Sequence, residues 1–126
     1  MIHLDANILV TLPYLIEQNH PLIERIGNGE QAAVCAPVWY EFLIGPLSES
    51  ERDLARHFIR NDVVPLTAED AALAAELFNR AGRKRSLKTD ALIAAAAIRA
   101  KVEFLTFNTA DFKPFVRDGL RLFEAP

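Results

Sequence analysis

Short apolar segments alternate along the chain with longer segments in which apolar residues recur at helical spacing. The short segments predict strands at 2–5, 32–36, 63–66, 103–106 and 120–123. The spacing between them predicts helices over 8–18, 21–26, 37–44, 48–61, 68–81 and 89–101, and a short turn or helix at 109–112. Strands that alternate with helices are typical of right-handed crossovers and a parallel sheet. We therefore expect an α/β fold, a three-layer α/β/α sandwich whose mainly parallel sheet has four to five strands.

The composition is that of an ordinary compact domain. Of 126 residues, 51% are hydrophobic and 25% are charged, and no repeat, low-complexity tract or linker interrupts them. We expect one domain over residues 1–126. The single cysteine, Cys35, excludes an internal disulfide, and neither it nor the histidines have zinc-ligand spacing. The chain start lacks a signal-peptide pattern, and the longest apolar run, 91–98, is far shorter than the roughly 20 residues of a membrane span. We therefore expect a cytoplasmic protein that does not enter a membrane.

Two sequence patterns have the form of binding motifs. Residues 27–32 match the G-x-G-x-x-A spacing of dinucleotide sites, but they follow a predicted helix and precede a predicted strand, the reverse of the required order, so we interpret them as a loop. Five of the 14 basic residues lie between positions 80 and 88, although the net charge is -3. This basic run is either a phosphate-binding patch or a solvated loop between two helices.

Four acidic residues stand beside apolar elements. Asp5 follows the first strand, Glu41 lies within the apolar helix 37–44, Asp90 begins the apolar helix 89–101, and Asp111 follows the fourth strand. Three of them also have a structural explanation: Asp90 favours a helix N-terminus, Glu41 can face solvent, and Asp111 can cap a turn. If all four meet at one edge of the sheet, their repulsion calls for a cation. Oxygen ligands without histidine or cysteine favour Mg²⁺ or Mn²⁺.

Taken in order, these motifs resemble those of the PIN domain, and in particular the VapC-type toxin ribonucleases of bacterial toxin-antitoxin pairs. The resemblance spans essentially the whole chain and rests on residues 2–9, 41–45, 84–95, 105–112 and 119–120. It implies a catalytic, metal-binding quartet with a supporting polar group. The quartet is Asp5, Glu41, Asp90 and Asp111, and the supporting residues are Asn7, Thr106 and Asn108. Two departures are Ala6, where the family usually has a hydroxyl residue, and the missing glycine before the fourth strand.

The resemblance implies a Mg²⁺- or Mn²⁺-dependent endoribonuclease that cleaves single-stranded or loop RNA and is restrained by a cognate antitoxin. Arg83, Lys84 and Arg85 would then hold phosphates, while Trp39 and Tyr40 would either stack bases or belong to the core. We also expect a homodimer, because the helices carry more apolar residues than one small sheet can cover. These residues are Leu12, Tyr14, Leu15, Ile16 and the run Phe42–Ile44.

Two other functions remain open on the sequence alone. One is a PIN-like module that binds RNA or protein without cleaving it, and the intact set of acids disfavours it. The other is a phosphohydrolase of small molecules on an α/β sheet. A protein that binds metal but cleaves no RNA would be the first alternative. A protein that hydrolyses a generic phosphoester without competition from added RNA would be the second.

Overall fold

The computed structural model describes residues 1–123, and its centre is one parallel sheet of five strands. The strands are β1 (Ile2–Leu4), β2 (Ala32–Cys35), β3 (Val63–Val64), β4 (Glu103–Leu105) and β5 (Arg121–Leu122). Their order across the sheet is β3-β2-β1-β4-β5, and every neighbouring pair is parallel. The predicted α/β fold is confirmed.

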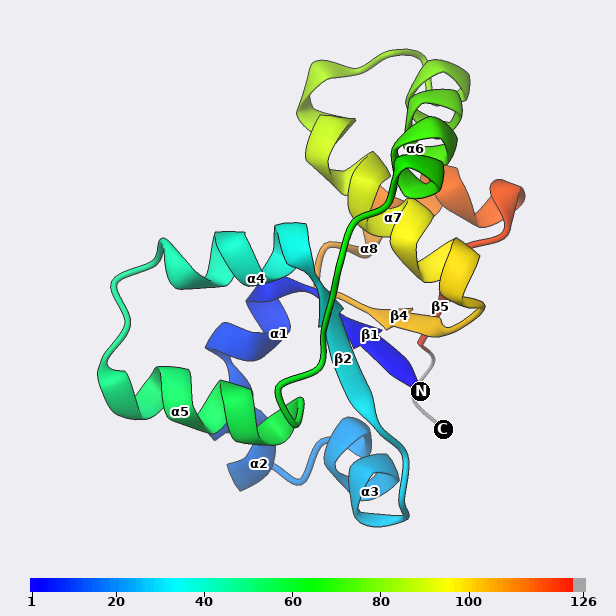
Figure 1. The fold of residues 1–126 in the computed structure, drawn as a ribbon. Helices are drawn as coiled ribbons and strands as arrows, with labels where there is room; N and C mark the ends of the chain where they lie inside the picture. The colour runs from blue at the N-terminus through cyan, green and yellow to red at the C-terminus, as the bar shows by residue number, and fades with distance from the viewer. Residues whose placement is uncertain (124–126) are drawn as a thin grey trace.

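Helices cover both faces of the sheet (Figure 1). The chain forms α1 (Ala6–Val10), α2 (Leu12–Glu17), α3 (Pro21–Gly27), α4 (Ala36–Leu43), α5 (Glu49–Phe58), α6 (Ala68–Arg80), α7 (Lys88–Ala100) and α8 (Thr109–Phe112). Two 3₁₀ helices, η1 (Arg85–Leu87) and η2 (Lys113–Asp118), precede α7 and follow α8. Figure 1 shows α1, α4 and α5 on one side of the sheet and α6, α7 and α8 on the other.

Local sequence signals place several helix ends where they were expected. Ser48 and Glu51 form the capping box of α5, and Thr67 and Asp70 form that of α6. The loop at 27–32 connects α3 to β2, as its context predicted. The apolar run at the start of α7 is buried, which confirms that this helix packs against the sheet.

Two predicted helix boundaries are wrong, and one 3₁₀ helix was not predicted. The segment 8–18 is two helices that meet at Thr11, because a continuous helix would bring the ring of Pro13 against the carbonyl four residues earlier. Helix α5 ends at Phe58 rather than near 61, because Arg60 and Asn61 both have positive φ. No local signal predicted η2, which continues directly from α8.

The strand order positions the candidate site. From β1 the chain moves outward to β2 and β3, and then crosses back to β4 and β5 on the other side of β1. Ligands of open α/β sheets bind where the order reverses in this way, beyond the carboxyl ends of the strands. Here that point lies between β1 and β4, where the Asp5 backbone N–H donates to the Leu105 carbonyl at 2.9 Å. We refer to it as the β1–β4 edge.

Candidate active site at the β1–β4 edge

Asp5 is the most enclosed carboxylate at this edge, with 7% of the residue exposed. It is the N-cap of α1, and its Oδ1 accepts a hydrogen bond from the Ala6 backbone N–H at 2.8 Å. Its Oδ2 accepts from the Thr106 hydroxyl at 2.6 Å. Burial raises the pKa of Asp5, and these two hydrogen bonds to Thr106 and Ala6 oppose the rise. Asp5 is therefore a fixed carboxylate in a site that disfavours its charge.

Asp90 is the acid most affected by its surroundings. It lies in the first turn of α7 and is half-buried. Its pKa is raised to about 6, first by loss of hydration and then by the charges of Asp5, Asp111 and Glu41. A helix N-terminus by itself stabilises a carboxylate, so these effects outweigh the helix dipole. The structure thus brings all four predicted acids close enough for three of them to act on Asp90.

Glu41 and Asp111 form the exposed part of the group. Glu41 lies on α4, and its pKa is raised by loss of hydration and then by the charge of Asp5. The sequence offered two surroundings for Glu41, solvent or a positive partner, and the structure shows solvent together with a like charge. Asp111 lies on α8, where its charge contributes to the raised pKa of Asp90.

The donor chemistry of these four residues fits a hard divalent cation, since all are carboxylates and three resist ionisation in its absence. The side chains do not form a closed cage. Within residues 1–123, no three acidic, histidine or cysteine side chains are grouped closely enough to hold an ion together. A cation at this edge would therefore require the carboxylates of Asp5, Glu41, Asp90 and Asp111 to draw together around it.

A polar network supports Asp5 from the β4–α8 loop. The Asn7 side-chain amide lies 3.5 Å from Oδ2 of Asp5 and 3.4 Å from the Thr106 hydroxyl, which are long donor distances. The side-chain oxygen of Asn7 accepts a hydrogen bond from the Phe107 backbone N–H at 3.2 Å. The Thr106 hydroxyl accepts one from the Asn108 backbone N–H at 2.9 Å. Asn7, Thr106 and Asn108, three residues that the resemblance marked, thus lie in one network around Asp5.

Comparison with known proteins identifies the fold. A family model described as the PIN domain matches residues 2–115. The chain belongs to the PIN domain family. PIN domains are generally nucleases and typically depend on a divalent metal, which agrees with the acidic chemistry of the β1–β4 edge. No curated protein sequence matches the chain.

Solved structures share this PIN fold at low sequence identity. A chain of FitAcB from Neisseria gonorrhoeae is 18% identical, with a TM-score of 0.73 over 99% of this chain and 98% of that one. A chain of VapBC2 from Rickettsia felis, bound to a promoter DNA fragment, is 22% identical, with a TM-score of 0.71 over 98% of each chain. A chain of a toxin-antitoxin complex from Klebsiella pneumoniae is 22% identical, with a TM-score of 0.66 over 89% and 90%.

The basic run of this PIN domain leads directly into the site. Arg83, Lys84 and Arg85 are exposed and lie between α6 and the end of η1, which continues into α7 and Asp90. Arg83 is held against α6, because its guanidinium donates to the Asn79 side chain and lies 5.6 Å from the centre of the Phe78 ring. Among residues 1–123, no ion pair involves Arg83, Lys84 or Arg85. Arg80 differs from them, since it pairs with Glu76 and Asp118.

Burial divides the apolar residues that were expected at an interface. Leu12, Leu15 and Phe42 are buried in the core, so the prediction that they add to an exposed apolar surface is wrong. Tyr14, Ile16 and Ile44 are exposed, as are Val10 and Tyr40. Trp39 belongs with the core: it is half-buried, and its ring centre lies 5.3 Å from that of Phe42. No helix within residues 1–123 combines the length and the apolar character needed to span a bilayer.

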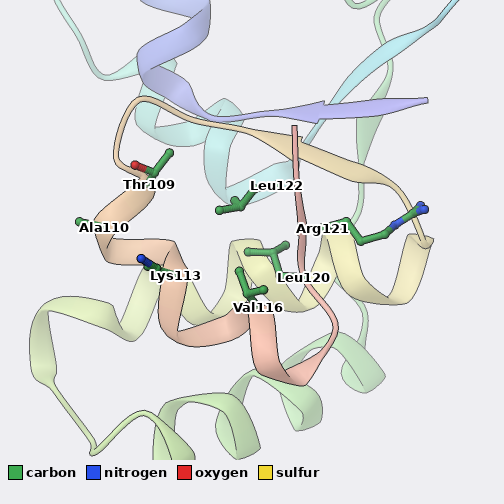
Figure 2. Close-up of a pocket in the computed structure, with 7 residues that line it drawn as sticks. All are labelled: Thr109, Ala110, Lys113, Val116, Leu120, Arg121 and Leu122. Carbon is green, nitrogen blue, oxygen red and sulfur yellow. The ribbon is translucent and has the colours of Figure 1, made fainter. Parts of the chain in front are cut away.

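A cavity of about 690 Å³ lies on the β5 side of this region, between α8, η2 and β5 (Figure 2). It is lined by Thr109, Ala110, Lys113, Val116, Leu120, Arg121 and Leu122. Figure 2 shows Arg121 pointing away from Val116 and Leu120, toward the end of α7, where it donates to the Lys101 carbonyl at 2.5 Å. None of the four acids lines this cavity, so it is separate from the candidate active site.

Proposed function

We propose that this PIN domain is a Mg²⁺- or Mn²⁺-dependent endoribonuclease that hydrolyses single-stranded or loop RNA. The observation that carries the proposal is the raised pKa of Asp5, Glu41 and Asp90 at one edge of the sheet, where neighbouring carboxylates contribute to the rise for Glu41 and Asp90. Carboxylates that crowd in this way bind a divalent cation readily, because the cation removes their repulsion. Unpaired RNA is the favoured substrate, since its phosphates and bases can spread over an open edge, whereas a duplex hides its base edges.

The four acids have separate positions in the proposed reaction. Asp5 and Asp90 would be the principal metal ligands, and Glu41 and Asp111 would complete the set from the exposed side. A bound Mg²⁺ or Mn²⁺ supplies an activated water and neutralises charge on the leaving oxygen of the phosphodiester. The chain itself orients Asp5, through the hydrogen bonds from Thr106 and Ala6. The Thr106 hydroxyl is itself held by a hydrogen bond from the Asn108 backbone N–H, with a longer contact from the Asn7 side-chain amide.

The basic run would bind the RNA backbone on the side of the site where α7 begins. Lys84 and Arg85 are exposed and lie within six residues of Asp90 along the chain, so they can contact phosphates near the scissile bond. The contact of Arg83 with Asn79 and Phe78 holds its guanidinium near α6. We expect the positive charge of Arg83 to contribute to RNA binding, from a position near α6 that the guanidinium already occupies before RNA binds.

We further propose that the whole chain, residues 1–126, is one domain that acts as the VapC-type toxin of a toxin-antitoxin pair. The support is the fold that it shares with a chain of the toxin-antitoxin complex from Klebsiella pneumoniae. An antitoxin would restrain the nuclease, which otherwise degrades the RNA of its own cell. Co-expression with the product of an adjacent gene tests this point: it should relieve the growth arrest that the protein alone causes.

We also propose a homodimer. Two groups of exposed apolar side chains support it. One is Val10, Tyr14 and Ile16 on α1 and α2, and the other is Tyr40 on α4 with Ile44 directly after that helix. Helix α1 packs against α4, and both helices lie on the same side of the sheet (Figure 1). Sedimentation should show a dimer at tens of micromolar, an order of magnitude set by weak-interface affinities. Only monomer at that concentration would refute it.

The deciding experiment measures cleavage of single-stranded RNA by the purified protein with Mg²⁺, with Mn²⁺ and with excess EDTA. We expect cleavage with either metal and none with EDTA. Asp5→Asn and Asp90→Asn should abolish cleavage, whereas Asp53→Asn should retain it, because Asp53 is an exposed acid that pairs with Arg56 on α5. Sequencing RNA ends after brief expression, with Asp5→Asn beside the wild type, would then identify the sites that are cut.

Other outcomes would favour the alternative functions. RNA binding without cleavage in the presence of metal would indicate a non-cleaving module. Turnover of a generic phosphoester that RNA does not inhibit would indicate a small-molecule phosphohydrolase. Cleavage that continues in EDTA, after contaminating nucleases have been excluded, would refute the metal-dependent reaction.

A further inference from the structure

Phe107 is unusual among the phenylalanines of this protein. Seven of the eight phenylalanines lie in the core or pack against it, whereas Phe107 is 51% exposed. Burial of a phenylalanine side chain stabilises a fold, so this half-exposed ring forgoes part of that stabilisation. A single exposed aromatic ring is common on protein surfaces and carries no argument by itself. The position of Phe107 and the hydrogen bonds of the backbone around it distinguish this ring.

The backbone on both sides of the Phe107 ring is fixed to the candidate site. Its own N–H donates to the Asn7 side chain at 3.2 Å, across the β1–β4 edge. The preceding residue, Thr106, is buried and donates to Asp5 at 2.6 Å, and the following residue, Asn108, donates its N–H back to the Thr106 hydroxyl. The exposed ring is therefore attached to a well-anchored backbone, next to the residue that orients Asp5 and four residues before Asp111.

We propose that Phe107 is a stacking platform for one unpaired base of the RNA substrate, next to the scissile phosphodiester. This inference rests on the proposed ribonuclease function and adds a determinant of substrate position to it. An exposed aromatic face on an anchored backbone is suited to this role, because bases of single-stranded RNA stack on aromatic side chains whatever their sequence. Such a contact also explains how an open acidic edge, which repels phosphates, retains RNA near the metal ligands.

A protein partner fits the same surface less well. Large exposed apolar patches mark protein interaction sites, whereas the residues that follow Phe107 in the chain, Asn108 and Thr109, are polar and exposed. The exposed apolar side chains of α1, α2 and α4 form a larger group than this single ring. One ring among polar groups matches the size of one base.

The test compares Phe107→Ala, Phe107→Leu, Phe107→Tyr and Phe107→Trp in cleavage of a single-stranded RNA oligonucleotide by metal-loaded protein. Loss of the aromatic face should lower kcat/KM by about 5- to 150-fold in the Ala and Leu variants. The Tyr and Trp variants should retain most of the activity, because they keep an aromatic face. The melting temperature and its rise with Mn²⁺ should match the wild type in all four variants, since Phe107 is not a metal ligand.

A second arm uses oligonucleotides in which one nucleotide at a time lacks its base. Removal of the stacked base should slow the wild type by a factor similar to that of Phe107→Ala, and should have no further effect on that variant. Affinity measured in an Asp90→Asn background, where cleavage is blocked, should show the same pattern. The two effects would then report one interaction between the ring and one base.

The outcomes separate this inference from the proposed function. If Phe107→Ala cleaves as fast as the wild type, or Phe107→Leu retains full activity, the stacking inference is overturned while the ribonuclease function stands. Equal sensitivity of wild type and Phe107→Ala to every missing base would also overturn it. A wild-type protein that cleaves no RNA with either metal would overturn the proposed function, and this inference with it.

Discussion

The hydroxyl of Thr106 donates a hydrogen bond to Oδ2 of Asp5 at 2.6 Å, although 101 residues separate them in the chain. The contact joins the end of β4 to the end of β1, the two strands between which the chain order reverses. It is one of two hydrogen bonds that oppose the effect of burial on the Asp5 pKa. The tuning of the central carboxylate thus depends on a residue from the other half of the sequence.

Thr106→Val should weaken metal binding and cleavage, since it removes this donor while keeping a similar shape. The pKa of Asp5 should rise further, and an outer-shell change of this kind typically lowers metal affinity about 10- to 100-fold. Thr106→Ser, which keeps the hydroxyl, should stay close to the wild type. Calorimetric titration with Mn²⁺ measures the affinity directly. Wild-type affinity in the Val variant would show that Thr106 does not support the site.

The pH dependence of stability tests whether the acids repel one another in the metal-free protein. Asp90 has a pKa of about 6 when folded, above its value of 3.8 in the unfolded chain. The folded state therefore binds this proton more tightly, so stability is gained below pH 6 and lost as pH rises through it. Between pH 7.5 and 5, the free energy of unfolding of the wild type should rise by about 1 kcal/mol relative to that of Asp90→Asn. The rise is no larger because water screens the partly exposed carboxyl.

Comparison of the two proteins is needed because His3 acts in the opposite direction. His3 is buried on β1, and burial lowers its pKa, so acidification through about pH 6.5 costs stability as the unfolded chain takes up protons. This contribution is common to the wild type and to Asp90→Asn and cancels in their difference. Urea denaturation at each pH supplies the free energies. If the difference in free energy of unfolding between the two proteins does not change with pH, the surroundings of Asp90 do not raise its pKa.

Removal of the exposed charges of the basic run should change the salt dependence of RNA binding. The slope of log K against log salt falls by about 0.7 for each phosphate of a single strand that the protein no longer neutralises, and so by about 1.4 for Lys84→Ala with Arg85→Ala. Arg60→Ala is a suitable control, because Arg60 lies with Gln31 at the opposite edge of the sheet, before β2 begins. Mn²⁺ binding should be unaffected. An unchanged slope in the double variant would identify the run as a solvated loop.

The backbone of Lys101 has a conformation that suits glycine better than lysine. Lys101 ends α7 with φ 58° and ψ 44°, the left-handed region that costs a residue with a side chain. Lys101→Gly should therefore raise the free energy of unfolding by about 0.5–1 kcal/mol. Lys101→Ala should not raise the free energy of unfolding, because it removes the charge but keeps a side chain in the left-handed region. Cleavage should be the same in both, since Lys101 lies at the edge opposite the acids.

Local signals in the sequence determined most of the secondary structure. Apolar runs bounded by glycine, proline and polar residues specified the five strands, and the Ser48–Glu51 and Thr67–Asp70 pairs specified two helix starts. These signals act between residues a few positions apart, so they can be recognised without knowledge of the fold. The four acids were identified for a related reason, because each is a charged residue next to an apolar element.

Only the tertiary structure decided which of these residues meet and which are exposed. Leu12, Leu15 and Phe42 are indistinguishable by pattern from Tyr14 and Ile44, yet the first three are buried and the last two are not. Phe107 lies within a motif that the sequence revealed, but nothing in that motif indicates that its ring faces solvent. The Asp5–Thr106 contact depends on the pairing of β4 with β1, two strands that lie about a hundred residues apart in the chain. Burial is a property of the assembled chain, because central elements such as β1 pack against segments far from them in sequence, β4 among them.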